Sequence, residues 1–205
     1  IPLLLILNVL LAFAVSVAGF TIAQLEQMQN ILPCAAAALK WLANDRKGQF
    51  LTAPFHISYR SNIMIYLVLV LAAVILDQLV KYWTIQNLMG SPCFVIPGVF
   101  QLTYVENRGT AFSFLQGQIW LFTITTILIL LVIAYAFWKQ LILSKLGRAS
   151  LAMIAGGAIG NFLDRILRGY VVDMFYFELI DFPVFNIADV FIVIGGILFA
   201  YYFMI

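Results

Sequence analysis

The chain has 205 residues, of which 64% are hydrophobic and only 10% are charged. A water-soluble domain is usually about 45–50% apolar and about 25% charged, so the composition excludes an ordinary soluble enzyme and indicates an integral membrane protein. The net charge of +2 is too small to indicate a nucleic-acid partner.

Residues 1–60 are the least regular part of the sequence. Residues 1–20 are almost entirely apolar and about long enough to span a bilayer of about 30 Å, so they predict either an additional transmembrane helix or the core of a signal sequence. Residues 21–60 read as an amphipathic and polar linker. Because Ile1 is not a methionine, we expect a fragment or a processed product. We assign residues 1–60 no catalytic role.

The first regular span covers residues 63–83, whose only charges are Asp77 and Lys81. The two lie four residues apart with the acid first, which is the favoured order for an ion pair on one helix face. Two interpretations stay open at this point. The pair either neutralises itself near the membrane interface or takes a direct part in chemistry.

The composition changes at residues 90–105, where proline and glycine are interspersed with β-forming residues instead of a continuous apolar span. This pattern predicts a short strand pair outside the membrane. Asn107 and Gly109 come directly after it and are typical of a turn. Their position beside the polar residues described below favours a functional role.

Residues 119–138 form a second span without any charge, and Lys139, Lys145 and Arg148 follow it in a predicted loop. By the positive-inside rule this loop is cytoplasmic. The loop at 84–118 and the connection at 168–183 then lie on the opposite, outer side.

A third span, residues 149–167, is built differently. Gly156 and Gly160 form a small-xxx-small face that lets another helix approach closely. Asn161, Asp164 and Arg165 fall on roughly one side of the helix. We therefore expect a polar stripe that faces the interior of a helix bundle.

The last two aspartates stand at the ends of apolar segments. Asp173 lies in an interfacial connection at 171–183, and Asp189 lies in the first turn of a final span at 186–205, three residues after Asn186. Buried ionisable groups in a membrane protein are costly and are usually functional. We interpret Asp173 and Asp189 as a pair, which predicts an aspartyl peptidase at a membrane surface.

Five blocks carry a resemblance to a known family: residues 77–81, 107–112, 156–165, 171–173 and 185–189. From about residue 61 to residue 205 the chain resembles lipoprotein signal peptidase (signal peptidase II), a bacterial membrane aspartyl peptidase. The resemblance implies an all-α integral membrane protein: a bundle of four transmembrane helices with a small extracytoplasmic β segment. The hydrophobic segment at 1–20 would add a further N-terminal helix. The implied domains are residues 1–60, an extension of unknown role, and residues 61–205, the peptidase.

The resemblance also implies roles for individual residues. Asp173 and Asp189 correspond to the catalytic dyad. Asn107, Gly109, Asn161, Arg165 and Asn186 correspond to groups that bind substrate or support the dyad, and Asp77, Lys81 and Asp164 to structural polar positions.

The implied substrate is a prolipoprotein whose lipobox Cys carries a diacylglyceryl group, cut before that Cys, with membrane lipids as further partners. Two carboxylates in a poorly solvated site share a proton and can activate water without a covalent intermediate. The implied location is the bacterial cytoplasmic (inner) membrane, as a multi-pass protein with an extracytoplasmic active site. We expect a monomer without a metal or other cofactor.

Three alternatives remain. A small transporter or proton pathway would also use intramembrane carboxylates, but it predicts them near the middle of the membrane. A membrane assembly protein would use the glycines for packing and leave Asp173 and Asp189 without a purpose. A different intramembrane aspartyl protease is the nearest enzymatic alternative, although the sequence lacks a Gly-x-Gly-Asp helix.

Overall fold

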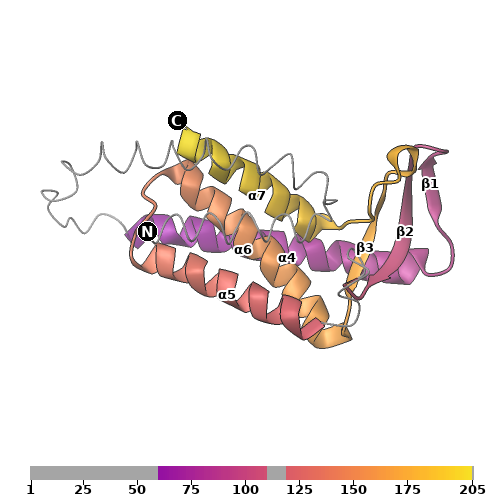
Figure 1. The fold of residues 1–205 in the computed structure, drawn as a ribbon, viewed down its shortest axis with the longest axis horizontal. Coiled ribbons are helices and arrows are strands. Elements are labelled where there is room, and N and C mark those ends of the chain that lie inside the picture. The colour runs from indigo at the N-terminus through magenta and orange to yellow at the C-terminus, as the bar shows by residue number, and fades with distance from the viewer. Residues whose placement is uncertain (1–59, 110–118, 205) are drawn as a thin grey trace, which may run out of the picture.

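The computed structural model describes residues 60–109 and 119–204. The hydrophobic helix expected at 1–20 and the linker at 21–60 lie outside the described residues. Four helices run side by side, and a small sheet stands at one end of them (Figure 1). The helices are α4 (Arg60–Leu88), α5 (Ile119–Trp138), α6 (Lys145–Arg168) and α7 (Ile187–Met204). The strands are β1 (Cys93–Ile96), β2 (Phe100–Asn107) and β3 (Val171–Tyr176), and η3 (Glu178–Ile180) is a 3-10 turn between β3 and α7.

Each of the four helices is long and apolar enough to cross a membrane. Large apolar side chains such as Leu71 on α4, Leu131 on α5 and Ile197 on α7 are exposed, as a lipid-facing surface requires. The expectation of four spans with a small β segment is confirmed. The first span is longer than predicted, because α4 continues to Leu88 before Gly90 adopts a left-handed conformation (φ +86°).

The central helix is α6, which packs against α4, α5 and α7. Of its span 67% is buried, against 17% for that of α4. Its glycine face allows this close packing, because a Cβ added to Gly156 would lie 2.6 Å from the Cβ of Ala73 on α4. A Cβ on Gly160 would lie 2.5 Å from Oδ2 of Asp77. The close helix approach expected at Gly156 and Gly160 is confirmed.

The helix α6 also begins earlier than predicted. Ser144 caps its N-terminus by accepting a hydrogen bond from the amide of Gly147, and Gly169 (φ +76°) ends it. Lys145 and Arg148 therefore lie in the first turn of α6 rather than in a loop, and Arg148 is buried with its Nε donating to the carbonyl of Ile142 (2.6 Å). Lys139, Lys145 and Arg148 thus still lie together at this end of the bundle.

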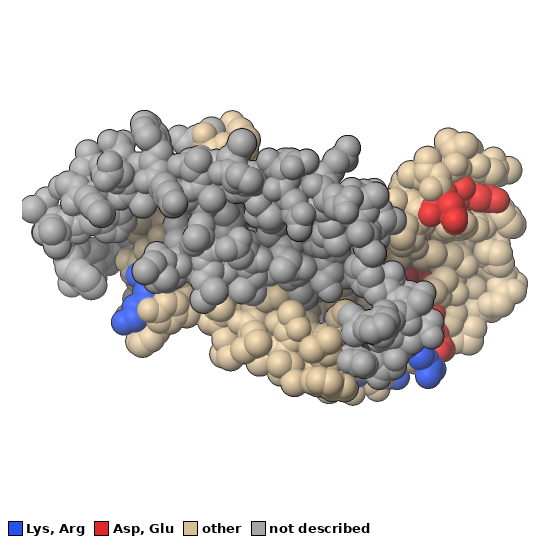
Figure 2. Space-filling model, viewed as in Figure 1, with Lys and Arg blue, Asp and Glu red and all other residues tan. Residues whose placement is uncertain are grey.

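Charged residues mark the two ends of the molecule. Figure 2 shows Asp and Glu side chains at the sheet end. In the sequence of this end, Glu178 and Asp181 are exposed around η3. Lys139 and Lys145 are exposed at the opposite end, where α5 stops and α6 starts.

The sheet has the order β1-β2-β3 with antiparallel pairing throughout. The β1-β2 pair was predicted, whereas β3 replaces what we expected to be an irregular connection. Its pairing aligns Asp173 with Val105 and Val171 with Asn107. A bridge between Phe175 and Phe185 then turns the chain back toward α7. The sheet thus delivers one aspartate to the end of the bundle where α7 begins.

Candidate active site

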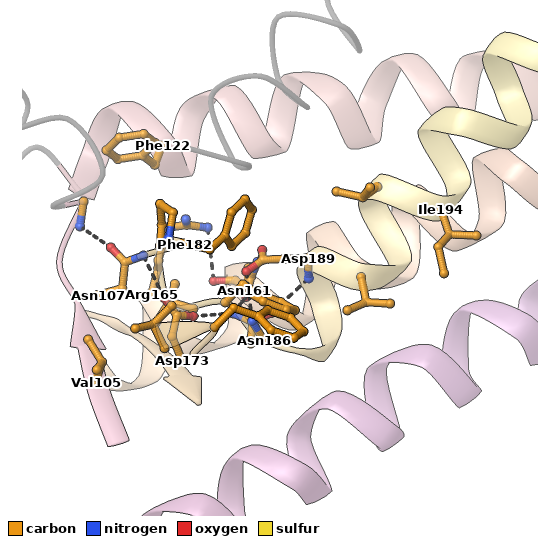
Figure 3. Close-up of a pocket in the computed structure, with 18 of the residues that line it drawn as sticks. Val105, Asn107, Phe122, Asn161, Arg165, Asp173, Phe182, Asn186, Asp189 and Ile194 are labelled. Carbon is orange, nitrogen blue, oxygen red and sulfur yellow. Dashed lines mark hydrogen bonds between the residues drawn. The ribbon is translucent and has the colours of Figure 1, made fainter. Parts of the chain in front are cut away.

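A cavity of about 710 Å³ lies where the sheet meets the helix bundle (Figure 3). Seven residues proposed from the sequence line it, six with polar side chains and one glycine: Asn107, Gly109, Asn161, Arg165, Asp173, Asn186 and Asp189. The remaining wall is apolar. It comes from Val105 and Val171 on the sheet, from Phe122 on α5, from the connection between β3 and α7, and from three residues along α7: Val190, Val193 and Ile194.

Asp173 enters the cavity from β3 and is 2% exposed. Its two carboxylate oxygens accept hydrogen bonds from different amides: Oδ2 from Nδ2 of Asn107 (2.8 Å) and Oδ1 from Nδ2 of Asn186 (2.6 Å). Asn107 reaches it from β2 because that strand is paired with β3. The side chain of Asp173 is therefore held in one orientation from two sides.

Asp189 is held by the start of α7. Its backbone amide donates to Oδ1 of Asn186 (2.9 Å), and its own Oδ2 accepts from the backbone amide of Asn186 (3.1 Å). This reciprocal arrangement is a capping box, in which two otherwise unpaired amides of the helix end are satisfied. Oδ1 of Asp189 accepts in addition from Nδ2 of Asn161 on α6 (2.8 Å). Asn186 and Asp189 are three residues apart, as noted in the sequence, and this is the spacing that a capping box has.

Asn186 connects the two aspartates. Its Nδ2 donates to Asp173 and also approaches Oδ1 of Asn161 (3.1 Å), while its Oδ1 accepts from the amide of Asp189. Asn186 and Asp173 are both buried. One carboxamide thus contacts both acidic residues and fixes how they lie relative to each other.

Arg165 and Gly109 complete the polar side of the cavity. The Arg165 guanidinium donates to the carbonyl of Asn161 (3.3 Å) and lies 5.6 Å from the ring centre of Phe122. Its charge acts on both Asp173 and Asp189. Gly109 (φ +90°) donates its amide to Oδ1 of Asn107 (2.9 Å), which orients the Nδ2 of that residue toward Asp173.

Three further residues proposed from the sequence, Asp77, Lys81 and Asp164, do not line the cavity. They lie behind it and are fully buried. The Lys81 ammonium contacts Oδ2 of Asp77 (2.8 Å) and Oδ2 of Asp164 (2.9 Å). It also donates to Oδ1 of Asn161 (2.8 Å), which joins this cluster to the cavity wall.

Two members of the buried cluster were missed by the sequence analysis. Gln78 donates to Asp77 and Asp164 (3.2 Å each), and Arg168 pairs with Asp164. Arg168 follows Asp164 by four residues, a spacing that could have revealed the pair. Phe122 was missed as well, because nothing distinguishes it from the other apolar residues of its span.

The environment of Asp173 alters its acidity. Burial raises the pKa of Asp173 to about 8, and the nearby charge of Asp189 acts in the same direction. Two carboxyl groups that interact in a poorly solvated site titrate as a pair. The arrangement can therefore hold one proton and one negative charge together near neutral pH, which is what acid and base catalysis by one dyad needs. Within the described ranges, no three His, Cys, Asp or Glu side chains are arranged to hold a metal ion.

Comparison with known proteins agrees with this geometry. A family model described as signal peptidase (SPase) II matches residues 69–205. The lipoprotein signal peptidase of Latilactobacillus sakei is 44% identical over 135 residues, which cover 65% of this chain and 89% of the relative. That of Caldicellulosiruptor bescii is 43% identical over 135 residues, or 66% of this chain and 87% of the relative.

Solved structures give the same result. A bacterial membrane enzyme at 2.3 Å resolution is similar, with a TM-score of 0.63 and 35% identity, over 70% of this chain and 89% of that one. A second such structure at 1.9 Å resolution has a TM-score of 0.62 and 36% identity, over 67% of this chain and 90% of that one.

Proposed function

The chain belongs to the signal peptidase II family, and from this premise we propose that it is a multi-pass membrane aspartic endopeptidase with Asp173 and Asp189 as its catalytic dyad. It removes the signal peptide from prolipoproteins. The observation that carries the assignment is the pairing itself: two carboxylates from β3 and α7 line one cavity, and Asn186 contacts both.

Hydrolysis follows from the shared proton. The ionised carboxylate takes a proton from a water molecule in the cavity, and the water oxygen attacks the scissile carbonyl. The protonated carboxyl group donates a hydrogen bond to the carbonyl oxygen as negative charge develops there. Collapse of the tetrahedral intermediate transfers a proton to the leaving amine and returns the dyad to its starting state. No covalent intermediate and no cofactor take part.

Arg165, Asn107 and Asn161 position the substrate backbone and the dyad. All three present polar groups to the cavity, and two of them already bond to an aspartate. Positioning matters strongly, because a misplacement of about 1 Å can reduce a rate by about 100-fold.

The substrate class fits the mixed character of the cavity. Val190, Val193 and Ile194 extend its apolar wall along α7, away from the dyad and into the membrane span. We propose a diacylglyceryl-modified Cys next to the scissile bond, because each buried CH₂ of its chains adds about 0.8 kcal/mol of membrane affinity and keeps the bond at the interface. Membrane lipids are further partners, and the enzyme acts as a monomer.

The positions of three basic residues support the proposed location. Lys139, Lys145 and Arg148 lie at the end remote from the sheet, so the positive-inside rule supports a cytoplasmic position for that end. The sheet and the dyad then face the extracytoplasmic side of the bacterial inner membrane.

The transporter alternative is not favoured, because Asp173 stands on a strand beyond the helices and Asp189 in the first turn of α7.

A cleavage assay tests the assignment. The purified chain in lipid should release the signal peptide from a diacylglyceryl-modified prolipoprotein and act much more slowly on the unlipidated form. Asp173→Asn and Asp189→Asn should each lower the rate by on the order of 10²–10⁴-fold. Asp181→Asn is the matched control, because Asp181 lies on the same connection but is exposed, and its carboxylate accepts a hydrogen bond from the hydroxyl of Tyr176 outside the cavity.

The outcomes separate the parts of the proposal. Near-normal cleavage by either dyad variant would contradict the assignment of the dyad. Equal rates on lipidated and unlipidated substrate would contradict the role of the lipid. We also propose that residues 61–205 are the peptidase domain, so a chain beginning at Ser61 should cleave as fast as the full chain.

A further inference from the structure

Lys81 uses all of its hydrogen-bonding capacity in the interior of the protein. Its ammonium group has three donors and is fully buried, and it contacts Asp77, Asp164 and Asn161 at 2.8, 2.9 and 2.8 Å. These three acceptors come from α4 and α6. None of them belongs to the dyad, but each is hydrogen-bonded either to a dyad residue or to the residue directly before one.

The two carboxylates that Lys81 joins hold the backbone beside the two catalytic residues. Oδ1 of Asp77 accepts from the amide of Ala188 (2.9 Å), the residue before Asp189. Oδ2 of Asp164 accepts from the amide of Val172 (3.2 Å), the residue before Asp173. On α7 and again on β3, a carboxylate bound to Lys81 thus accepts from the backbone amide directly before an aspartate of the dyad.

Asn161 provides the third connection. Its Oδ1 accepts from Lys81 and Asn186, so the amide must present Nδ2 to Asp189. A reversed amide would place an NH₂ group against an ammonium group. Lys81 thereby selects the orientation in which Asp189 receives a hydrogen bond.

We propose that Lys81 is a positioning residue that sets the separation and orientation of Asp173 and Asp189, acting through Asp77, Asp164 and Asn161. The inference rests on the proposed function, because it presumes that these two aspartates are the dyad. Lys81 does not line the cavity and takes no part in the proton transfers.

A purely stabilising role does not account for the cluster. Neutral acceptors would satisfy the amides of Val172 and Ala188 without burying any charge, and buried ion pairs are often no more stable than apolar side chains of similar size. Two carboxylates brought together without a cation would repel each other. The ammonium of Lys81 therefore links the strand that carries Asp173 to the helix that carries Asp189, through the two carboxylates that it contacts.

The test must separate positioning from charge balance. Asp77, Asp164, Lys81 and Arg168 carry two negative and two positive charges, so Lys81→Met leaves one uncompensated negative charge. The double variant Lys81→Met with Asp77→Asn restores the balance, and the introduced carboxamide keeps an oxygen for the amide of Ala188. We expect this double variant to melt close to the parent chain while kcat falls by about 100-fold and KM changes little.

Lys81→Arg gives a second test that keeps the charge. A guanidinium is longer and planar, so it cannot reproduce three contacts made by one nitrogen atom. We expect a folded protein whose kcat is at least about tenfold lower, with KM nearly unchanged. Lys145→Met is the control, because Lys145 is exposed at the far end of α6.

The measurements are kcat and KM on a diacylglyceryl-modified prolipoprotein and the melting temperature, all with the full chain. A folded double variant or a folded Lys81→Arg variant with kcat within about threefold of the parent would overturn the inference, and so would a loss confined to KM. Loss of folding in all Lys81 variants would assign the residue to stability and overturn it as well. Failure of the proposed function is distinct, since the unmodified chain would then not cleave.

Discussion

Asp173, a member of the proposed dyad, lies in an environment that opposes its ionisation. Two amides hold its carboxylate, but burial and the neighbouring Asp189 raise its pKa to about 8. In an unfolded chain the same group would ionise near its ordinary value of 3.8. The folded protein therefore retains a proton at neutral pH that the unfolded chain has released.

The pH dependence of cleavage should reveal this proton. Because the reaction needs one protonated carboxyl group, we expect kcat to fall as the pH rises through about 8, roughly tenfold per pH unit above it. Initial rates between pH 6 and about pH 10, with substrate in excess, check this expectation. A rate that is constant across that range would contradict a shared proton.

Stability should change with pH in the same direction. The raised pKa favours the folded state while Asp173 is protonated, a contribution that is complete below pH 3.8 and lost as the pH rises through about 8. Melting temperatures of the parent chain should thus be lower at about pH 9 than at about pH 6. Asp173→Asn removes the titrating group, so its melting temperature should depend less on pH.

Glycines decide how closely the elements around the dyad can approach. A Cβ on Gly157 would collide with the carbonyl oxygen of Ala188 and lie 2.8 Å from Cγ1 of Ile192, both on α7. Gly196 on α7, in contrast, has nothing within 4 Å of such a Cβ. The two positions offer the same substitution with opposite consequences.

We expect Gly157→Ala to push the first turn of α7 away from α6, to cost about 1–3 kcal/mol of stability and to slow cleavage, because Asp189 lies in that turn. Gly196→Ala should be neutral or stabilising by about 0.5–1 kcal/mol. Thermal melting in detergent and the cleavage rate measure both effects. If Gly157→Ala melts at or above the parent temperature, the packing argument is wrong.

The elements differed in how well they could be predicted. The helices were visible because a span of apolar residues has a length that the bilayer dictates. The strand β3 was missed because its partner β2 is distant in the sequence, as the separation of 66 positions between Asn107 and Asp173 illustrates. The pairing of β2 with β3 brings Asn107 near Asp173.

The polar residues of the cavity were all named from the sequence, because a carboxamide or a charge is conspicuous in an apolar chain. Their contacts were not predictable in the same way. The cap formed by Asn186 and Asp189 follows from local spacing, but the contacts of Lys81 with Asn161 and Asp164 join residues from different helices. Arg168 had a visible partner four residues earlier, but the pattern was not used and no role was assigned to it.

At the scale of the whole molecule, the exposed lysines support the proposed orientation in the membrane. Lys139 and Lys145 lie at one end of the bundle, and the sheet with Asp173 lies at the other. Cys93 on β1 is exposed and free, which makes the sheet end directly accessible to chemical labelling.

In intact bacterial cells we expect a membrane-impermeant maleimide to label Cys93 from outside, once Cys34 has been replaced by Ser. A Lys145→Cys variant that also lacks Cys93 should be labelled only after the membrane is permeabilised. Gel-shift detection of the labelled chain measures both. Labelling of Cys93 only after permeabilisation would place the sheet in the cytoplasm and contradict the proposed orientation.

The hydrogen bond from Ala188 to Asp77 has a consequence for biosynthesis. It joins residues 111 positions apart, so Asp77 on α4 cannot accept this hydrogen bond until α7 has been inserted. A nascent chain that has released only α4, α5 and α6 into the membrane lacks Asp189 and leaves Lys81 with its partners unanchored to α7. We therefore expect no cleavage activity from a chain that has not yet inserted α7, because it lacks one member of the proposed dyad.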